Sequence, residues 1–472
     1  MKPRRTRLAA LLVAVPLAAA AAAVAQADED TDVTPVATDR PAQLVKLAPG
    51  VQIDPILSAS DIVGGDSAGD TTGAYQMSGI PDGIGAFRSS KSTVDLLLNN
   101  ELQGTPSNAR ISHLVLDRKS RGVTRAEYVL DGSEGYKRFC SATLAKIGGV
   151  PWYFTGEENT PGRSVAINAQ TDRVRETNHF GYFDHENVAP ITGLPYGAFV
   201  STEDGSADKS QLYAYFAPTY KDAIEGNGQL FVWKADGSAD STSDVHKSDS
   251  SLAGRFVPLT RTENANAATL ENAAQAKGAF DFTRLEDVAQ SKTSDRTLYF
   301  DDTGALGAQT QKGRLYQLRL DNGFDWSQFD ASDPSTYPTA SLKVLLDGDH
   351  GDDIVNPDNI DVSDSTMVIQ EDRNAENRPA SVAGGYGRVI TYDLGDKTLT
   401  PVARVATPDG TLPGEWESSG VLDASKLLGQ DWWLLDVQSH SSTVPQPGAS
   451  LEPNSSSGED GQLLAVRIPG SS

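Results

Sequence analysis

Six polar residues occupy equivalent places in a repeating sequence pattern, and five of them carry a carboxylate. Each stands shortly before a small or branched apolar residue. They are Asp82, Cys140, Glu186, Glu286, Asp358 and Glu417. Carboxylates that converge away from water repel one another, and they persist only when protonated or neutralised by cations. Because calcium takes many oxygen ligands at once, such a set predicts a calcium-binding centre.

Cys140 is the single cysteine of the chain, so no internal disulfide can form. A lone cysteine is often a small buried hydrophobic residue, and that is the alternative interpretation. Its place among the carboxylates favours a thiolate ligand instead. A thiolate suits iron or zinc better than calcium. We therefore expect calcium on the carboxylates and a transition metal on Cys140.

Arg284 precedes Glu286 by two residues, so on a strand both side chains face the same side. An arginine beside a carboxylate metal site is placed to bind a phosphate oxygen through its fork of N–H donors. The alternative is a structural ion pair between Arg284 and Glu286. The position of Arg284 on a repeat strand favours the phosphate-binding role.

Composition and missing motifs exclude several classes of protein. The formal net charge is -24, which repels nucleic acid and anionic lipid. His185-Glu186 does not begin a zinc-protease motif, because Ala189 stands where the second histidine would be. The sequence also lacks a P-loop.

The elements that must position these residues are short strands. Runs such as VDLLLNNE at 94–101 and TMVIQED at 366–372 end in acidic or amide residues, and each is followed by a second run that often starts with glycine. Irregular repeats of this kind predict an all-β protein, a six-bladed β-propeller with a partly helical insertion at about 218–280. A pair of β-sandwiches and a seven-bladed ring are the alternatives.

The acidic ends of the runs are further candidate metal ligands. If the first strand of each blade lines a channel, the runs that follow lie on neighbouring strands. We include Glu157, Glu203 and Glu371 among the predicted ligands, beside Cys140 and the carboxylates above.

The N-terminus predicts export. Residues 1–27 join a basic start, an Ala-rich apolar run and a small-residue cleavage site at Ala25-Gln26-Ala27, which is the order of a signal peptide. Arg4-Arg5 is a loose twin-arginine pattern, and an ordinary Sec signal is the alternative. We expect a flexible segment at 28–40 and one domain at 41–472, secreted, monomeric and not bound to membrane.

Several segments resemble the PhoX-type alkaline phosphatases (DUF839). Pro81–Phe87 followed by LLLNNEL is similar to the opening blade of that family. Further motifs follow in the family's order between about residues 75 and 440: Cys140 with Pro151-Trp152 and Glu157-Glu158, His185-Glu186 with Thr202-Glu203-Asp204, Arg284-Leu285-Glu286, and Asn356-Pro357-Asp358-Asn359.

The resemblance implies a six-bladed propeller that hydrolyses phosphate monoesters at a cluster of Ca²⁺ and Fe³⁺. In that family the cysteine bridges two irons, glutamates complete the cluster and an arginine contacts phosphate. These roles fall on Cys140, Glu186, Glu286 and Arg284. Asn100 stands where the family usually has histidine, and Gln438-Ser439-His440 replaces a Gln-His-Pro motif.

Two classes of function follow. The first is a secreted metal-dependent phosphatase acting on a small phosphoester, with a propeller phosphodiesterase or phytase as its nearest variant. The second is a calcium-stabilised, non-catalytic propeller that binds ligands or partners. Cys140 together with Arg284 favours the enzyme, because an inert scaffold needs neither residue.

Overall fold

A computed structural model describes residues 34–64, 73–103, 108–249, 251–372, 386–406, 414–446 and 456–472. The chain divides into two units, Met1–Thr34 and Pro35–Ser472, and the account below concerns the second. The predicted signal peptide at 1–27 and part of the predicted flexible segment at 28–40 lie outside the described residues.

Antiparallel sheets make up most of the second unit. The first sheet holds β5 (Pro81–Arg88), β6 (Thr93–Asn100), β7 (Arg110–Asp117) and β8 (Val123–Leu130). The next holds β9 (Thr143–Ile147), β10 (Val150–Gly156), β11 (Ser164–Asn168) and β12 (Arg173–Glu176).

A nine-stranded sheet follows along the chain. Its strands, in spatial order, are β13 (His185–Pro190), β14 (Gly197–Glu203), β15 (Leu212–Ala217), β16 (Gln229–Ala235), β17 (Leu252–Leu259), β21 (Thr339–Asp347), β20 (Arg314–Leu320), β19 (Thr297–Asp302) and β18 (Leu285–Gln290).

The last two large sheets each include an N-terminal strand. One holds β22 (Pro357–Val362), β23 (Thr366–Glu371), β24 (Arg388–Asp393), β25 (Leu399–Val405) and β1 (Leu44–Lys46). The other holds β26 (Trp416–Asp423), β27 (Trp432–Gln446), β28 (Ser456–Arg467) and β2 (Gln52–Ser58). A small sheet pairs β3 (Ile62–Val63) with β4 (Tyr75–Gln76). Pairing of β2 with β28 links the two ends of this unit.

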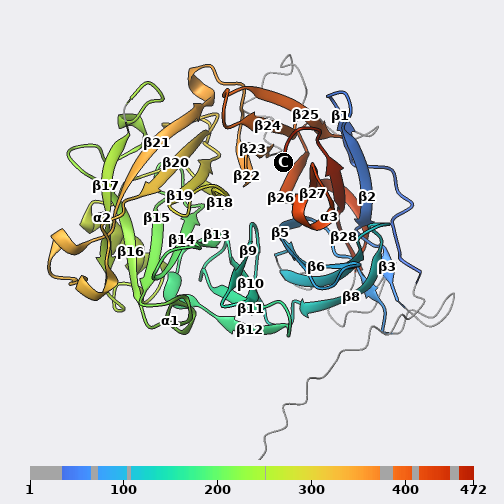
Figure 1. The fold of residues 1–472 in the computed structure, drawn as a ribbon, viewed down its shortest axis with the longest axis horizontal. Coiled ribbons are helices and arrows are strands. Elements are labelled where there is room, and N and C mark those ends of the chain that lie inside the picture. Colours follow the sequence, from blue (N-terminus) through green and yellow to red (C-terminus); the bar gives the residue numbers. More distant parts are fainter. Residues whose placement is uncertain are drawn as a thin grey trace, which may run out of the picture. The chain divides into compact units, whose positions relative to one another are not determined.

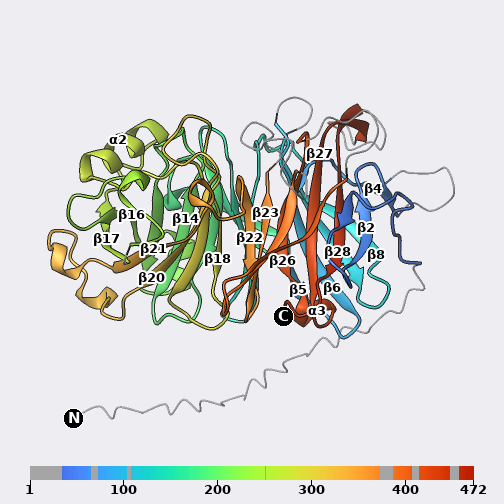
Figure 2. The same ribbon diagram turned by 90° about the horizontal axis from the view of Figure 1, so that it is seen from above.

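The innermost strands contact one another in sequence around a common centre. The order is β5, β9, β13, β18, β22 and β26, and β26 contacts β5 again. Within residues 35–472, Figure 1 shows the sheets radiating from this centre, and Figure 2 shows β18, β22 and β26 running side by side. The arrangement is propeller-like, as predicted, and it brings the first strand of each repeat to one place.

The predicted count of six separate blades is wrong. The described residues form four separate sheets of four or five strands, one nine-stranded sheet and the small β3–β4 pair. The reason is the pairing of β17 with β21, which joins the outer strands of two neighbouring repeats into one sheet.

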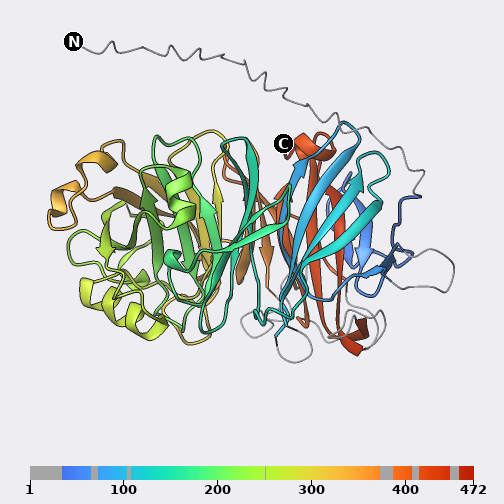
Figure 3. The same ribbon diagram turned by 90° about the horizontal axis from the view of Figure 1, so that it is seen from below.

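Residues 218–280, the predicted partly helical insertion, supply both strands and helices. β16 and β17 belong to the nine-stranded sheet, whereas α1 (Tyr220–Glu225) and α2 (Ala267–Lys277) are helical. Leu270 and Ala274 of α2 pack into an apolar cluster with the sheet, and Figure 3 shows α2 from below at the outer side of these strands. The remaining helices are α3 (Ser425–Leu428) and the 3₁₀ turns Asn178–Phe180, Thr242–Asp244, Trp326–Gln328, Pro334–Thr336 and Gly348–His350.

A glycine followed by an arginine stands at or just before the start of β11, β20 and β24. These pairs account for the glycine that often begins the second run of each sequence repeat. Gly162, Gly313 and Gly387 all have positive φ, and a β-carbon on Gly162 would lie 2.0 Å from a backbone oxygen of Phe183. The arginine that follows each glycine turns back to a carboxylate of the strand before or after it. These pairs are Arg163 with Glu157, Arg314 with Asp347, and Arg388 with Glu371.

His113 ties the β5–β8 sheet to the β9–β12 sheet. Its Nδ1 lies 2.8 Å from Asp172 Oδ1 in the turn between β11 and β12, and its Nε2 lies 3.6 Å from Asp95 Oδ2 on β6. Glu127 stands directly opposite on β8. Burial lowers the pKa of His113, but the hydrogen bonds and charges of Asp172 and Asp95 outweigh it and raise the pKa to about 9.

We predict that this contact stabilises the fold only while His113 is charged. The folded pKa lies above the unfolded value, so the stabilisation is full below about pH 6.5 and is lost as pH rises through about 9. His113→Gln should lower the free energy of unfolding by on the order of 2 kcal/mol at pH 6 and by much less at pH 10. Urea denaturation of both proteins at the two pH values measures this, and an equal difference at both would contradict it.

Candidate metal centre

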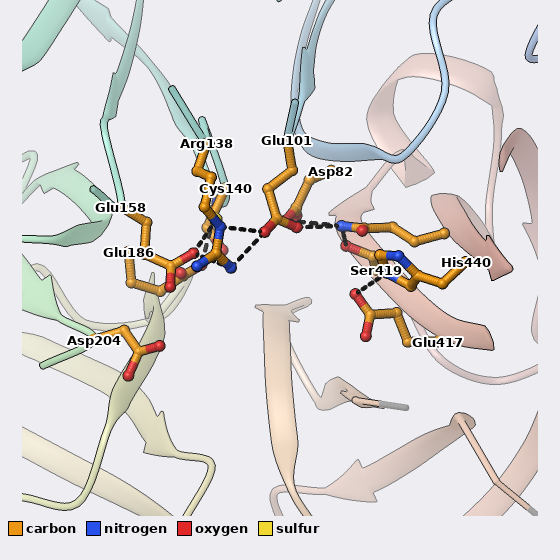
Figure 4. Close-up of polar contacts among 12 residues, drawn as sticks. Asp82, Glu101, Arg138, Cys140, Glu158, Glu186, Asp204, Glu417, Ser419 and His440 are labelled. Carbon is orange, nitrogen blue, oxygen red and sulfur yellow. Dashed lines mark hydrogen bonds and ion pairs between the residues drawn. The ribbon is translucent and has the colours of Figure 1, made fainter. Parts of the chain in front are cut away.

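The structure brings most of the predicted ligands together where the innermost strands begin. Three overlapping groups have ligand atoms within 4.8 Å of one another. They are Asp82 with Glu101 and Cys140, Cys140 with Glu158 and Glu186, and Glu186 with Glu286 and Asp358. Because Cys140 and Glu186 are each shared, the groups form one continuous centre, part of which Figure 4 shows.

β-Bulges aim four of these carboxylates inward. The pairing register shifts between Pro81 and Ile84, His185 and Val188, Leu285 and Val288, and Pro357 and Ile360. Asp82, Glu186, Glu286 and Asp358 each lie inside such a shift. A bulge breaks the two-residue alternation of a strand and redirects a side chain, and the same irregularity recurs at four of the innermost strands.

Burial and mutual repulsion raise the pKa values of the converging carboxylates. Burial is the larger cause, and neighbouring carboxylates add to it for Asp82, Glu158, Glu286 and Asp358. Burial also raises the pKa of Glu186 to about 8, although a hydrogen bond from Ser141 opposes the shift. In the absence of cations these acids therefore tend to hold protons near neutral pH.

Cys140 lies in the middle of the centre as a buried thiol. Its Sγ donates to Glu158 Oε2 at 2.7 Å. Burial first, and then the charges of Glu101 and Glu158, raise the pKa of the thiol. A thiolate forms here only when a metal ion compensates both effects.

The donor set fits bound cations. Both carboxylate oxygens of Asp301 on β19 are buried without a hydrogen-bond partner, and Asp287 and Glu186 are among the charges that raise its pKa. Clustered carboxylate oxygens suit a hard ion such as calcium, and the adjacent thiol suits a softer metal. The residues are therefore suited to hold metal ions.

Two arginines border the centre. Arg284 binds Asp204 with both arms of its fork, Nε to Oδ1 at 3.0 Å and Nη2 to Oδ2 at 2.7 Å, and lies 3.5 Å from Glu286. Arg138 donates from Nε to Glu101 Oε1 at 2.8 Å and contacts Glu158 Oε2 at 2.7 Å. Figure 4 shows Arg138 between those two acids. The centre thus carries positive groups that can meet an anion.

The family model described as "Alkaline phosphatase PhoX" matches residues 122–409, which include Cys140, Glu186, Arg284, Glu286 and Asp358. The chain belongs to this family. It is accordingly a hydrolase, an alkaline phosphatase of the PhoX type. The resemblance found in the sequence is confirmed.

Comparison with solved structures gives matches at low sequence identity. Pseudomonas fluorescens PhoX in complex with vanadate, described as a transition state analogue, is 14% identical, with 93% of this chain and 98% of that chain covered and a TM-score of 0.61. A puromycin-hydrolyzing peptidase from Mycobacterium tuberculosis is 11% identical over 75% of this chain and 49% of that chain, with a TM-score of 0.33. Among curated proteins, no sequence matches the chain.

Three predicted ligands do not join the metal centre of this PhoX-family chain. Arg163 binds both oxygens of Glu157, and Arg388 binds both oxygens of Glu371. Glu203 accepts a hydrogen bond from the backbone N–H of Gln211. The structure thus gives these acids local partners between strands, away from the groups that can hold a metal ion.

Sequence reasoning overlooked the acid that follows two of these residues. Side chains on extended backbone alternate between two faces, so Glu158 and Asp204 point opposite to Glu157 and Glu203. Glu158 belongs to the metal groups, and Asp204 binds Arg284. The adjacent acids in the Glu-Glu and Glu-Asp pairs were the signal, and in the structure it is the second acid of each pair that lies at the candidate centre or beside Arg284.

The departures from the PhoX motifs have structural roles. Asn100 donates from its amide to the backbone oxygens of Ser78 and Gly79, so it holds a loop beside β4. In the last sheet, Gln438 Nε2 donates to Glu101 Oε2 at 2.9 Å. His440 Nε2 lies 3.4 Å from Glu417. The last sheet therefore still supports the centre.

We predict opposite effects for the neighbouring acids Glu157 and Glu158. Glu157→Gln should destabilise the fold by about 3 kcal/mol, because it leaves Arg163 without its buried partner. The calcium-induced rise in melting temperature should remain. Glu158→Gln should reduce that rise and spare the cation-free protein, whose acids repel one another. Thermal melts with EGTA and with calcium measure both, and equal calcium responses would rule out Glu158 as a ligand.

Proposed function

We propose that this protein is an exported phosphatase that hydrolyses phosphate monoesters at a calcium and iron centre. The observation that supports it most is the convergence of Cys140 with Glu158, Glu186, Glu286 and Asp358 beside Arg284. A hydrolytic metal site needs such a set of ligands, whereas an inert binding scaffold has no use for a buried thiol among carboxylates.

The residues divide by ligand chemistry. Cys140, Glu158 and Glu186 would hold the iron, because they include the thiol. The remaining carboxylates, Glu286 and Asp358 on one side and Asp82 on the other, would hold calcium. Bound metal ions polarise a phosphoryl group and lower the pKa of a coordinated water.

Arg284 would bind and orient the phosphoryl group. Its side chain is 30% exposed, and its guanidinium lies 3.5 Å from Glu286 of the centre. A planar fork of N–H donors matches two phosphate oxygens, and Asp204 holds that fork in place. The relative from Pseudomonas fluorescens is described in complex with vanadate, which supports a site for a phosphate-like oxyanion.

Export remains a proposal that rests on the sequence of residues 1–27. None of the helices in the described part of the chain combines the length and apolar character that a membrane crossing requires. We propose secretion as a monomer through the twin-arginine route or the Sec route. Cell fractionation of the protein with and without residues 1–27 checks this.

We predict that Arg284 serves turnover more than folding. Arg284→Ala should lower kcat/KM for p-nitrophenyl phosphate roughly 100-fold, because a charge-assisted contact to the transition state is lost. Arg284→Lys should recover little of it, since lysine lacks the fork. Arg319→Ala, which changes an exposed arginine on β20, is the matched control and should keep full activity. Unchanged turnover in folded Arg284→Ala would leave only the ion-pair role.

Cys140 should be responsible for iron and for colour. Iron bound to a thiolate gives a visible charge-transfer band, so protein produced with ample iron should be coloured. Cys140→Ser should lose colour and iron while calcium still raises its melting temperature, because oxygen ligands hold calcium. Elemental analysis decides the matter: active, colourless wild-type protein without a transition metal would return Cys140 to the role of a core residue.

A further inference from the structure

Arg138 precedes β9, the innermost strand of its sheet, as Arg284 precedes β18. Each precedes a residue of the metal centre by two positions, Cys140 and Glu286 respectively. Both have positive φ, 49° and 56°, which residues other than glycine adopt rarely and at a cost. Ile80 and Asn356, two positions before Asp82 and Asp358, have the same kind of φ, 40° and 51°. The conformation therefore belongs to the repeat, and the fold holds two arginines at equivalent places in it.

The two arginines also make equivalent contacts. Arg138 joins Glu101, which follows β6 in the preceding sheet, to Glu158, which follows β10 in its own sheet. Arg284 likewise contacts Asp204, which follows β14 of the preceding repeat. Each guanidinium therefore bridges two neighbouring repeats at the edge of the metal centre.

Arg138 and Arg284 are accessible, unlike two arginines that are buried between strands. Arg314 and Arg388, which pair with acids between strands, are 2% and 0% exposed. Arg138 is 32% exposed, close to the 30% of Arg284. An arginine that meets a ligand must be accessible, and both of these are. Access is not specific to that role, because Arg40, which pairs with buried Asp460, is 33% exposed.

Charge gives Arg138 a reason to contact the substrate. A phosphate monoester carries up to two negative charges near neutral pH, and the carboxylates of the centre repel it. Cations that bind Glu101 and Glu158 compete for the oxygens that Arg138 contacts here. A guanidinium released from those oxygens keeps N–H donors in a planar fork for a phosphate oxygen pair.

We propose that Arg138 is a second phosphate-binding residue, which holds the phosphoryl group together with Arg284. The inference rests on the proposed function and adds a specific residue to it. Two arginines rooted in different repeats contact a phosphoryl group from two directions, and this fixes its orientation better than one fork does. The chemistry recognised is the dianionic phosphoryl end, so this contact is the same whatever alcohol the phosphate esterifies.

The test compares two conservative variants by calorimetric titration of inorganic phosphate into cation-loaded protein. Arg138→Lys keeps the positive charge and removes the fork. Arg163→Lys makes the same change in the arginine that holds Glu157, and serves as the matched control. We expect Arg138→Lys to weaken phosphate binding about tenfold with calcium and iron contents unchanged, which corresponds to about 1.4 kcal/mol. Arg163→Lys should lower the melting temperature and keep the wild-type affinity.

The outcomes separate this inference from the proposed function. Wild-type phosphate affinity in Arg138→Lys and in Arg138→Met, with Arg284→Ala impaired, overturns the role of Arg138 and leaves the phosphatase intact. Loss of metal from both Arg138 variants in proportion to lost phosphate binding shows a role in holding Glu101 and Glu158, and also overturns it. Cation-loaded wild-type protein that neither binds phosphate nor hydrolyses p-nitrophenyl phosphate refutes the proposed function itself.

Discussion

Negative charge buried at the starts of the innermost strands is the constraint on which this structure depends. Glu186 belongs to two of the ligand groups, and burial together with neighbouring carboxylates raises its pKa to about 8. Arg138 and Arg284 each contact two acids of this region, which leaves others among the described residues, such as Asp301, without a hydrogen-bond partner. Cations would relieve the repulsion and supply the chemistry at once, so the same ions link folding to phosphoryl transfer.

The sheets keep structural and chemical acids apart by the alternation of extended backbone. Glu157 turns to Arg163 between strands, while Glu158, the next residue, turns to Cys140. The structural acid is bound through both oxygens by the neighbouring Arg163, whereas the inward acid lies beside the Cys140 thiol and the partly exposed Arg138. This arrangement lets a fold rich in carboxylates remain stable while a few of its carboxylates stay available to bind metal ions.

The sequence predicted the residues of the first strands better than those of the second. A polar residue recurs at or just before the start of the innermost strands. This pattern identified Cys140, Glu186, Glu286 and Asp358, and the structure brings them together. Glu157, Glu203 and Glu371 were chosen because acids also recur at the ends of the second strands. The face of the sheet to which such a side chain points depends on the strand register, and a shift of one residue moves it to the opposite face. The prediction of six separate blades failed for another reason. The pairing of β17 with β21 is a long-range contact that has no local sequence signal.

The arginines illustrate the same limit. Arg284 was identified from its spacing to Glu286, whereas Arg138, which has the same spacing to Cys140, was not identified. Anomalous diffraction from crystals of the metal-loaded protein, recorded on both sides of the iron absorption edge, tests the central claim most directly. The account predicts an iron peak within bonding distance of Cys140 Sγ and calcium peaks among Glu286, Asp358 and Asp82. A structure of active enzyme with no metal peak near these side chains would contradict it.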